Sequence, residues 1–421
     1  MLGSKATLDS VPDSKLEGAR VLMRVDFNVP LTKSGEVSDK TRILATLPTI
    51  ERVLSKKPKA LILMSHLGRP DGEAKPEFSL KPIVPLLSSL LNRPVTFLSD
   101  CVGEATVAAC RDASAGSVIL LENLRFHIEE EGSGVINGEK VKADKAAVSS
   151  FRLCLTSLGD IYVNDAFGTA HRGHSSMVGI DLGVKVAGLL MQKELEYFSK
   201  ALENPQRPLL AILGGAKVRD KIQLIHSMLD KVDILLIGGG MAYTFLKVLS
   251  SIDIGNSLFD EEGSRIVPEI MKKAAEKGVK ILLPSDWLCA DKFDKDATIK
   301  LASMDTGIPA GWMGLDIGCE SIKKFAETIA NAKTILWNGP LGVFEFPRFA
   351  NGSLGILDAV IAATQNGAVS IVGGGDTAAM VEGSGKASAV SHVSTGGGAS
   401  LELLEGKQLP GVLALSNKAD W

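Results

Sequence analysis

Apolar, β-branched runs alternate with stretches of helical periodicity along the whole chain, and this alternation predicts an α/β fold with parallel sheets. In the first half the runs lie at 20–28, 60–69, 118–126 and 161–168, and each begins apolar and ends polar. In the second half they lie at 208–217, 233–242, 333–342 and 368–377, and glycines gather at their ends. Ligands of open α/β sheets bind at the carboxyl ends of the strands, so we expect one functional edge in each half.

An amphipathic helix is expected between the halves. Met191, Leu195, Phe198 and Leu202 recur at helical spacing, before Asn204 and Pro205 end the pattern. This stretch is either an interdomain helix or an ordinary surface helix packed on one domain. The 421 residues also favour roughly two to three domains. We therefore expect two doubly wound parallel-sheet domains joined by an interdomain helix and a hinge. The segment 129–140 is expected to be an exposed loop whose acidic run faces solvent.

Charge and cysteine content restrict the classes of function. The net charge is −3, so no global field would hold the protein on nucleic acid or an anionic membrane, and any anion site must be local. The five cysteines are too scattered for a disulfide framework, and none lies in metal-ligand spacing with a histidine. No apolar run has the length of a membrane span, and the N-terminus lacks a signal peptide, so a cytoplasmic location is expected.

The first-half strands end in polar residues that suit a small polyanion. Converging arginines bind phosphate and carboxylate oxygens bidentately, and Asp26 or Asn28 could take hydroxyl groups or orient the arginines. Any one of these residues alone is more often structural, but their recurrence at four strand ends favours a binding site. The residues brought to this edge are Asp26, Asn28, Arg42, His66, Arg69, Arg125, His171 and Arg172.

The second-half strands end in glycine runs that suit phosphate. Gly214 and Gly215 precede Lys217 and Lys221, whose spacing predicts that both lysines share one face at the start of a helix. Two cations there oppose the helix dipole unless an anion offsets them. A second run, 373–375, is followed by Asp376 and Thr377, ligand types that hold Mg²⁺ beside phosphates.

Better-known nucleotide motifs fit less well. The stretch 383–388 fails the P-loop pattern, because Met380 and Ala387 stand where glycine and serine or threonine are needed. The stretch 373–378 formally satisfies the dinucleotide-binding pattern, although no acidic residue lies near 20 positions on to bind a ribose. A dehydrogenase and a catalytically silent binding protein therefore stay open as alternatives. No nucleophile for covalent catalysis is evident.

Longer motifs carry a family resemblance. The strings RVDFNVP, SHLGRP, ENLRF, NDAFGTAHRGHSS, GGAKVRDKI, GGGMAYTFLK, WNGPLGVFE and GGGDT occur in the order typical of phosphoglycerate kinases. The chain resembles that family from about residue 5 to about residue 417. The resemblance implies a monomeric, two-domain hinge enzyme of glycolysis that transfers the acyl phosphate of 1,3-bisphosphoglycerate to Mg-ADP, giving 3-phosphoglycerate and ATP. It also implies a triose domain of residues 1–187 plus 405–421 and a nucleotide domain of residues 188–404, with 188–204 as the interdomain helix.

The resemblance further assigns residues to two sites. The triose site comprises Asp26, Asn28, Arg42, His66, Leu67, Gly68, Arg69, Arg125 and Arg172. The nucleotide site comprises Gly215, Lys221, Gly239, Gly314, Leu315, Asn338, Glu345, Gly374, Gly375, Asp376 and Thr377, with Asp376 as the Mg²⁺ ligand. Arg42, Lys217 and Lys221 are expected to stabilise the transferred phosphoryl group. Two departures from the family pattern are Gly173, expected to loosen the loop that bears Arg172, and Trp287, which puts nucleobase contacts in doubt.

Overall fold

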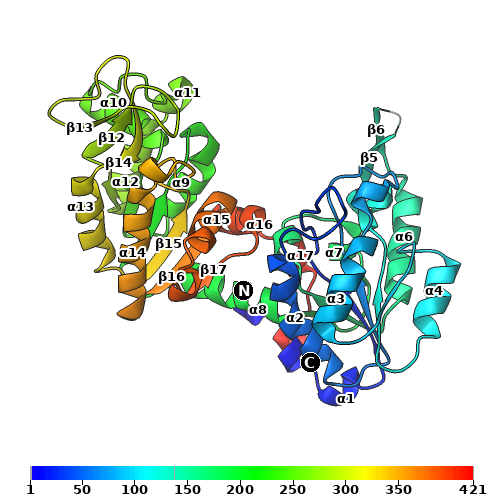
Figure 1. Cartoon of the computed structure of the whole chain (residues 1–421). Coiled ribbons are helices and arrows are strands. Elements are labelled where there is room, and N and C mark those ends of the chain that lie inside the picture. The colour runs from blue at the N-terminus through cyan, green and yellow to red at the C-terminus, as the bar shows by residue number, and fades with distance from the viewer. Residues whose placement is uncertain (1, 137, 421) are drawn as a thin grey trace. The chain divides into compact units, whose positions relative to one another are not determined.

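A computed structural model describes residues 2–136 and 138–420. The chain divides into two compact units (Figure 1). The first comprises the residues up to Glu196 and those from Gln408 onward, and the second comprises Tyr197–Lys407. Each unit contains a six-stranded parallel sheet with its helices, which confirms the predicted α/β class.

The sheet of the first unit has the strand order β3–β4–β2–β1–β7–β8. Its strands are β1 (Arg20–Arg24), β2 (Ala60–Met64), β3 (Val95–Phe97), β4 (Ser117–Leu120), β7 (Ile161–Asn164) and β8 (Lys185–Ala187). Strand β2 is buried throughout, as expected for a parallel strand covered on both faces. Strand β2 pairs with one side of β1, and β7, which comes later in the chain, pairs with the other side. The carboxyl end of β1 therefore borders the topological switch point, where ligands of such sheets bind.

Helices on the first unit follow recognisable start signals. Asp144 caps α6, because its side chain accepts hydrogen bonds from Ala146 N and Ala147 N. The helices are α1 (Asp13–Leu16), α2 (Thr41–Leu54), α3 (Val84–Leu91), α4 (Glu104–Arg111), α5 (Ile128–Glu131), α6 (Lys145–Ser157), α7 (Ser175–Val178) and α17 (Pro410–Leu413). Short 3₁₀ turns lie at Leu2–Ser4, Leu8–Ser10, Pro76–Phe78, Lys81–Ile83, Leu124–Phe126 (η5), Phe167–Thr169 (η6) and Lys418–Asp420.

The segment 129–140 is not the exposed loop that its sequence predicts. It contains the end of α5, the strand β5 (Ser133–Ile136) and the start of β6 (Glu139–Lys142), which pairs with β5 as an antiparallel hairpin. Gly134 lies so close to the neighbouring backbone that an added Cβ would be 2.3 Å from Asp71 O. This packing against the loop at Asp71 is a tertiary effect, so the local sequence does not reveal it.

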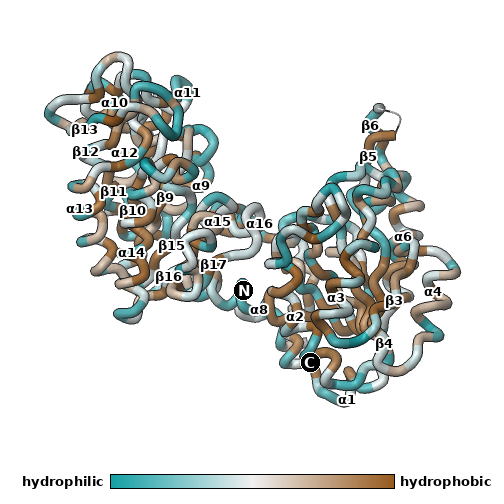
Figure 2. Tube along the Cα trace, in the orientation of Figure 1, coloured by the Kyte–Doolittle hydropathy of each residue, from teal (hydrophilic) through white to brown (hydrophobic). Residues whose placement is uncertain are grey.

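The sheet of the second unit has the order β11–β10–β9–β15–β16–β17. Its strands are β9 (Leu209–Leu213), β10 (Ile234–Ile237), β11 (Lys280–Leu282), β15 (Thr334–Asn338), β16 (Val369–Gly373) and β17 (His392–Val393). The strand order reverses between β9 and β15, which pair directly. The switch point therefore lies at the ends of these two strands. Figure 2 shows the hydrophobic strands inside each unit and polar segments around them.

A small antiparallel sheet accompanies this unit, and it was not expected from the sequence. Its order is β13–β12–β14, with β12 at Asp286–Ala290, β13 at Ile299–Ser303 and β14 at Met313–Ile317. The helices of the second unit are α9 (Ile222–Leu229), α10 (Met241–Ser250), α11 (Glu261–Ser264), α12 (Val267–Lys277), α13 (Cys319–Ile329), α14 (Asn351–Gln365), α15 (Gly375–Gly383) and α16 (Gly397–Leu404). Further 3₁₀ turns lie at Arg219–Lys221 (η7), Pro347–Phe349 and Ala387–Ala389.

The helix expected between the halves is α8 (Leu189–Leu202), and the boundary between the units falls within it. Its first turn is held in the first unit, where Asp165 Oδ1 accepts hydrogen bonds from Leu190 N (3.0 Å) and Met191 N (3.2 Å). In the second unit, the Tyr197 ring stacks on the His392 ring at a centroid distance of 4.8 Å. A helix with anchors in both units fits the interdomain interpretation better than the surface-helix alternative.

The carboxyl group of Asp165 makes stability depend on pH. Burial raises the pKa of Asp165 to about 6, from an unfolded value near 4. The folded state therefore binds the proton more tightly, and this group's stabilising contribution is full below pH 4 and is lost as pH rises to 6. We expect the free energy of unfolding of Asp165→Asn, relative to wild type, to rise by up to about 3 kcal/mol over that interval. Urea titrations of both proteins at several pH values test this. A difference that stays constant with pH would contradict it.

The first and last described segments of the chain both belong to the first unit. Ala6 N donates to Ser416 O (2.9 Å), and Ser416 N donates to Lys185 O (2.9 Å) at the edge strand β8. The Lys5 ammonium donates to Leu415 O (2.9 Å). The C-terminal segment is therefore hydrogen-bonded to the N-terminal segment.

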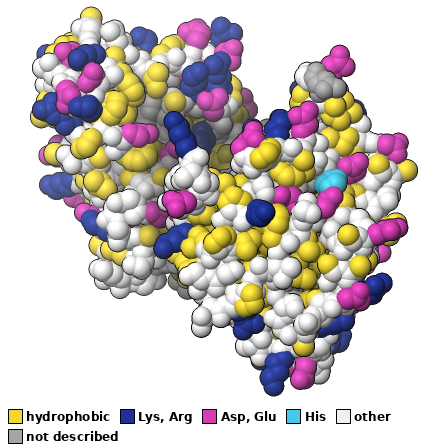
Figure 3. All heavy atoms as spheres, turned by 45° about the vertical axis from the view of Figure 1, so that its right-hand side comes forward, with side chains coloured by type: hydrophobic (Ala, Val, Ile, Leu, Met, Phe, Trp, Pro, Cys, Tyr) yellow, Lys and Arg dark blue, Asp and Glu magenta, His cyan; other side chains and the backbone are white. Residues whose placement is uncertain are grey.

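The face of the protein shown in Figure 3 carries charges of both signs. On the face shown in Figure 3, basic and acidic side chains are interspersed rather than gathered by sign. Among the described residues, no helix combines the length and the apolar composition needed to cross a membrane. Anion sites must therefore be sought locally, at the two sheet edges.

Candidate active site

The polar ends of four parallel strands bring the expected triose residues to one edge of the first sheet. Asp26 and Asn28 follow β1, and the stretch 66–69 follows β2. Arg125 lies in η5 after β4, and Arg172 follows η6 after β7. Since β1, β2, β4 and β7 are neighbours in the sheet, their loops share one edge.

Hydrogen bonds tie several of these residues together around Gly68. Gly68 N donates to Asn28 Oδ1, and Arg125 Nη1 donates to Gly68 O, both at 2.9 Å. Arg42 Nη1 donates to both carboxylate oxygens of Asp26, at 3.1 and 3.0 Å. Gly68 has a φ of +62°, and a Cβ there would lie 2.3 Å from the Phe78 ring. Glycine is therefore required where the two binding loops meet.

The electrostatics of two histidines show how closely the cations gather. The pKa of His66 is lowered well below its usual value, first by burial and then by Arg24, Arg125, His174 and Arg42. The pKa of His174 falls to about 3, first by burial and then by Arg125, Arg24, Arg172 and His171. Both rings are therefore neutral near pH 7. The arginines around them leave a positive potential that an anion would satisfy.

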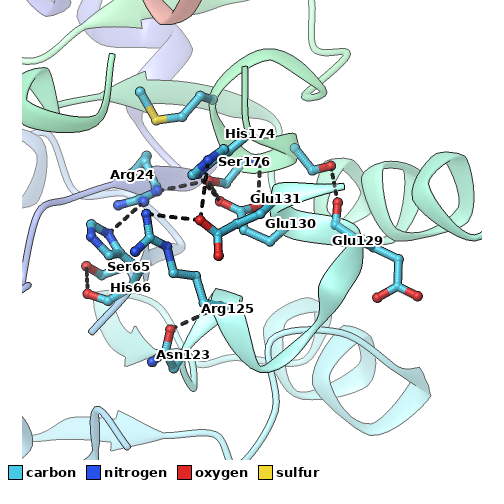
Figure 4. Close-up of polar contacts among 12 residues, drawn as sticks. Arg24, Ser65, His66, Asn123, Arg125, Glu129, Glu130, Glu131, His174 and Ser176 are labelled. Atoms are coloured by element: carbon cyan, nitrogen blue, oxygen red, sulfur yellow. Dashed lines mark hydrogen bonds and ion pairs between the residues drawn. The ribbon is translucent and has the colours of Figure 1, made fainter. Parts of the chain in front are cut away.

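A buried layer beneath this edge was not anticipated from the sequence (Figure 4). Arg24, the last residue of β1, is fully buried and donates to Ser176 Oγ (2.9 Å). Ser176 donates to both Glu130 oxygens, through N (2.9 Å) and Oγ (2.6 Å). Arg24 Nη2 also lies 3.1 Å from His66 Nδ1. This layer links β1, the loop after β2, α5 and α7, so it holds the loops that carry the arginines of this edge.

The acidic run is part of this layer rather than a solvated face. Glu130 is 1% exposed, and Glu131 Oε1 lies 3.4 Å from Arg125 Nη2 and 3.6 Å from His174 Nε2. Burial, the largest cause, lowers the pKa of Arg125 and raises that of Glu131, so the attraction between the two charges does not fully offset their desolvation. The prediction of a solvated acidic loop was wrong, because its carboxylates contact Ser176 and His174, which are distant in sequence, as well as the nearby Arg125.

A second cluster lies at the switch point of the second sheet. Lys221 Nζ donates to Asn338 Oδ1 at 2.7 Å, which joins the segment after β9 to the last residue of β15. Burial is the largest influence on the Lys221 ammonium and lowers its pKa, while Glu405, Asp376 and Asp220 act in the opposite direction. The lysine is thus held at the place where a ligand of this fold binds.

The same cluster contains an unused hydrogen-bond donor. Asn338 Nδ2 is buried and has no hydrogen-bond partner within the described chain. A Cβ at Gly374, where φ is +90°, would lie 3.0 Å from it, so glycine keeps the space beside the amide open. Gly375 and Asp376 begin α15, and Thr377 Oγ1 accepts a hydrogen bond from Gly339 N (2.7 Å). A free amide donor beside a helix N-terminus and a lysine suits a phosphate.

The prediction that Lys217 and Lys221 share a helix face was wrong. Helix α9 begins at Ile222, so Lys221 is its N-cap residue, while Lys217 lies in the preceding loop. Both lysines still precede the same helix N-terminus.

Other expected nucleotide residues come from adjoining segments. Gly215 N and O lie 2.8 and 2.9 Å from where a Cβ of Gly239 would be, so the loops after β9 and β10 are in contact. Leu315 O accepts from Val343 N (2.8 Å), which brings β14, with Gly314, to the loop containing Glu345. The structure gives no hydrogen bond or ion pair that joins Gly314, Leu315 or Glu345 to Lys221.

The two departures from the family pattern are structurally mild. Gly173 has nothing within 4 Å of where a Cβ would lie, so alanine would meet no neighbour there. Trp287 is 1% exposed and packs near Tyr243, at a ring distance of 6.3 Å, in the core of the small sheet. Its bulk fills that core rather than a surface pocket.

An α/β enzyme with one cationic edge and one glycine-rich, lysine-bearing edge has the construction of a two-domain phosphotransferase. The family model described as phosphoglycerate kinase matches residues 11–407. A curated phosphoglycerate kinase of Schizosaccharomyces pombe is 61% identical over 415 residues, covering 99% of this chain and 100% of that one. Phosphoglycerate kinase 1 of Sus scrofa is 59% identical over 418 residues, covering 99% of both.

A solved structure agrees. The phosphoglycerate kinase of Coxiella burnetii matches with a TM-score of 0.85 at 38% identity, covering 97% of this chain and 98% of that one. The chain belongs to the phosphoglycerate kinase family. The comparisons do not support the dehydrogenase alternative, because the matched family model, the two relatives and the solved structure are all described as phosphoglycerate kinases.

Proposed function

We propose that the chain catalyses the reversible transfer of the acyl phosphate of 1,3-bisphosphoglycerate to Mg-ADP, giving 3-phosphoglycerate and ATP. The observation that supports this most strongly is that each unit brings side chains or backbone groups suited to an anion to the carboxyl ends of its parallel strands. Two bound reactants, one at each edge, fit a two-substrate transfer better than a silent binding protein does.

In this proposal the first unit binds the triose. Arg69, Arg125 and Arg172 bind its phosphate and carboxylate oxygens, because guanidinium groups pair with such oxygens bidentately. Asn28 and Asp26 orient the loops through Gly68 and Arg42. His66, with Leu67 and Gly68, shapes the floor of the site.

The second unit binds the nucleotide. Lys221, Asn338 and the backbone at Gly374 and Gly375 bind phosphate oxygens. Mg²⁺ fits this edge, because Asp376 offers an exposed carboxylate in the first turn of α15, close enough to Lys221 to affect its pKa. When bound there, Mg²⁺ would neutralise phosphate charge. Gly215, Gly239, Gly314, Leu315, Glu345 and Thr377 complete the proposed nucleotide contacts.

For phosphoryl transfer the protein mainly has to position the two reactants and neutralise the charge of their phosphates, because the nucleophile is already an ADP phosphate oxygen. Arg42 from the first unit and Lys217 and Lys221 from the second stabilise the moving phosphoryl group. Neither unit carries all of these cations, so we propose that a hinge closes residues 1–187 plus 405–421 on residues 188–404. Bringing two bound reactants into reactive geometry can lower a barrier by about 7–11 kcal/mol.

We also propose that the enzyme acts as a monomer in the cytoplasm. All five cysteines are free thiols, which suits a reducing compartment. They are Cys101, Cys110, Cys154, Cys289 and Cys319.

A coupled assay tests the proposed function. Purified protein with ATP and 3-phosphoglycerate should form ADP and 1,3-bisphosphoglycerate, the latter detected by a downstream dehydrogenase. Omission of either substrate or of Mg²⁺ should abolish product. ATP hydrolysis at an equal rate without the triose would reject the proposal.

Replacing Arg125 should mainly weaken triose binding. In Arg125→Lys the bidentate fork is lost, and we expect the Kd for 3-phosphoglycerate to rise about tenfold or more while the Kd for ATP is unchanged. Isothermal calorimetry measures both. The matched control is Arg111→Lys, an arginine of the same unit that pairs with its exposed neighbour Asp112. Unchanged triose affinity in Arg125→Lys would remove this residue from the site.

A further inference from the structure

Three metal-ligating side chains from two separate segments meet in the first unit, outside both proposed substrate sites. Asp100 and Cys101 lie between β3 and α4, and His127 follows η5. A carboxylate oxygen, the Cys101 thiol sulfur and a His127 ring nitrogen all lie within 4.8 Å of one another. His127 Nε2 and Asp100 Oδ1 are 2.8 Å apart. Sequence spacing could not indicate this, since the histidine is distant from the cysteine along the chain.

We propose that Asp100, Cys101 and His127 form a binding site for a thiophilic divalent cation, with Zn²⁺ as the natural occupant. Thiolate, imidazole and carboxylate are the three ligand types that zinc takes in proteins, and thiolate disfavours Mg²⁺ and Ca²⁺. In a tetrahedral centre these three side chains would leave the fourth position for water.

The charges of the ligands can balance a divalent cation. Cys101 is fully buried. When the cation binds, the thiol proton leaves to solvent, and the two positive charges of the ion are balanced by one thiolate and one carboxylate.

The ligands are partly preorganised and accessible. Asp100 Oδ1 accepts the backbone N–H groups of Cys101 (2.7 Å) and Val102 (3.3 Å), and the His127 ring packs against Phe151 at a centroid distance of 5.4 Å. The side chains of Asp100 and His127 are 51% and 29% exposed, so an ion can enter from their side. His127 lies two residues after Arg125, so the ion would fix the segment that bears this arginine.

Cobalt spectroscopy of the full-length protein tests the proposal. Titration of the metal-free protein with Co²⁺ should give a thiolate-to-cobalt charge-transfer band that saturates at about one Co²⁺ per chain and is removed by added Zn²⁺. The band should be absent in Cys101→Ser. It should persist in Cys319→Ser, an exposed cysteine of the second unit, and in Cys154→Ser, whose sulfur lies by the same turn at 3.4 Å from Gly103 N.

A second variant distinguishes loss of the metal ligand from misfolding caused by the Cys101→Ser substitution. His127→Gln keeps the thiol and should weaken Co²⁺ affinity at least about tenfold. No charge-transfer band in the wild-type protein would overturn the proposal. A band that survives Cys101→Ser, or Co²⁺ affinity unchanged in His127→Gln, would overturn it as well.

Discussion

Replacing Lys217 or Arg42 by alanine is expected to lower kcat on the order of 10²-fold or more while each substrate still binds. Both cations are proposed to act on the phosphoryl group in transit, so their loss should cost more in the transition state than in the ground state. In the structure Arg42 is 43% exposed and is held by Asp26 at the sheet edge, so the guanidinium can reach a ligand without disturbing the core.

Steady-state kinetics in both directions measure this effect, and calorimetry gives the separate affinities. The matched control for Arg42→Ala is Lys40→Ala, which removes an exposed cation from the same segment just before α2. The control should keep kcat near the wild-type value. A kcat within about twofold of wild type in Lys217→Ala or Arg42→Ala would exclude that residue from the transfer step.

Removal of the Glu130 carboxylate should destabilise the first unit by about 3–5 kcal/mol, the usual cost of leaving a buried charge without its partner. Glu130 accepts hydrogen bonds from the backbone N–H and the hydroxyl group of Ser176. The Ser176 hydroxyl oxygen in turn accepts a hydrogen bond from Nε of the buried Arg24. In Glu130→Ala the Ser176 N–H and hydroxyl would lose their acceptor, and the positive charge of Arg24 would lose a nearby compensating charge.

Urea unfolding monitored by circular dichroism measures this loss. The adjacent Glu129→Ala is the matched control, because the Glu129 side chain points away from the network in Figure 4. We expect the control to change the free energy of unfolding by less than about 0.5 kcal/mol. A loss below about 1 kcal/mol in Glu130→Ala would show that the buried layer does not hold this edge together.

The central strands of both sheets were predictable because parallel strands buried on both faces leave long apolar runs. The edge strands were not. Strand β17 has two residues, and β3 begins buried but continues exposed and half-buried, so neither gives a clear pattern. The small sheet of the second unit was not predicted for a similar reason, because β13 is largely exposed and so has no clear apolar pattern.

The exposed site residues were easier to predict than those beneath them. Arginines in the loops after strands are easily recognised in a sequence as candidate binding residues. Arg24 lies within an apolar run, so the sequence indicates only that it belongs to a strand. Glu130 looks like a solvated charge because its partners, Ser176 in α7 and His174 just before that helix, lie far away along the chain. The same is true of Cys101 and His127, whose proximity depends on how β3 and β4 pair. Gly314, Leu315 and Glu345 followed from family resemblance alone.

Hydrogen–deuterium exchange on the intact protein tests the central claim most directly, namely that each unit holds one of the two substrates. With 3-phosphoglycerate alone, protection should rise in peptides containing Asn28, Arg69 and Arg125 and stay unchanged in those containing Lys221 and Gly374. With Mg-ADP alone, the pattern should be reversed. Protection of the same unit by both ligands would contradict the account.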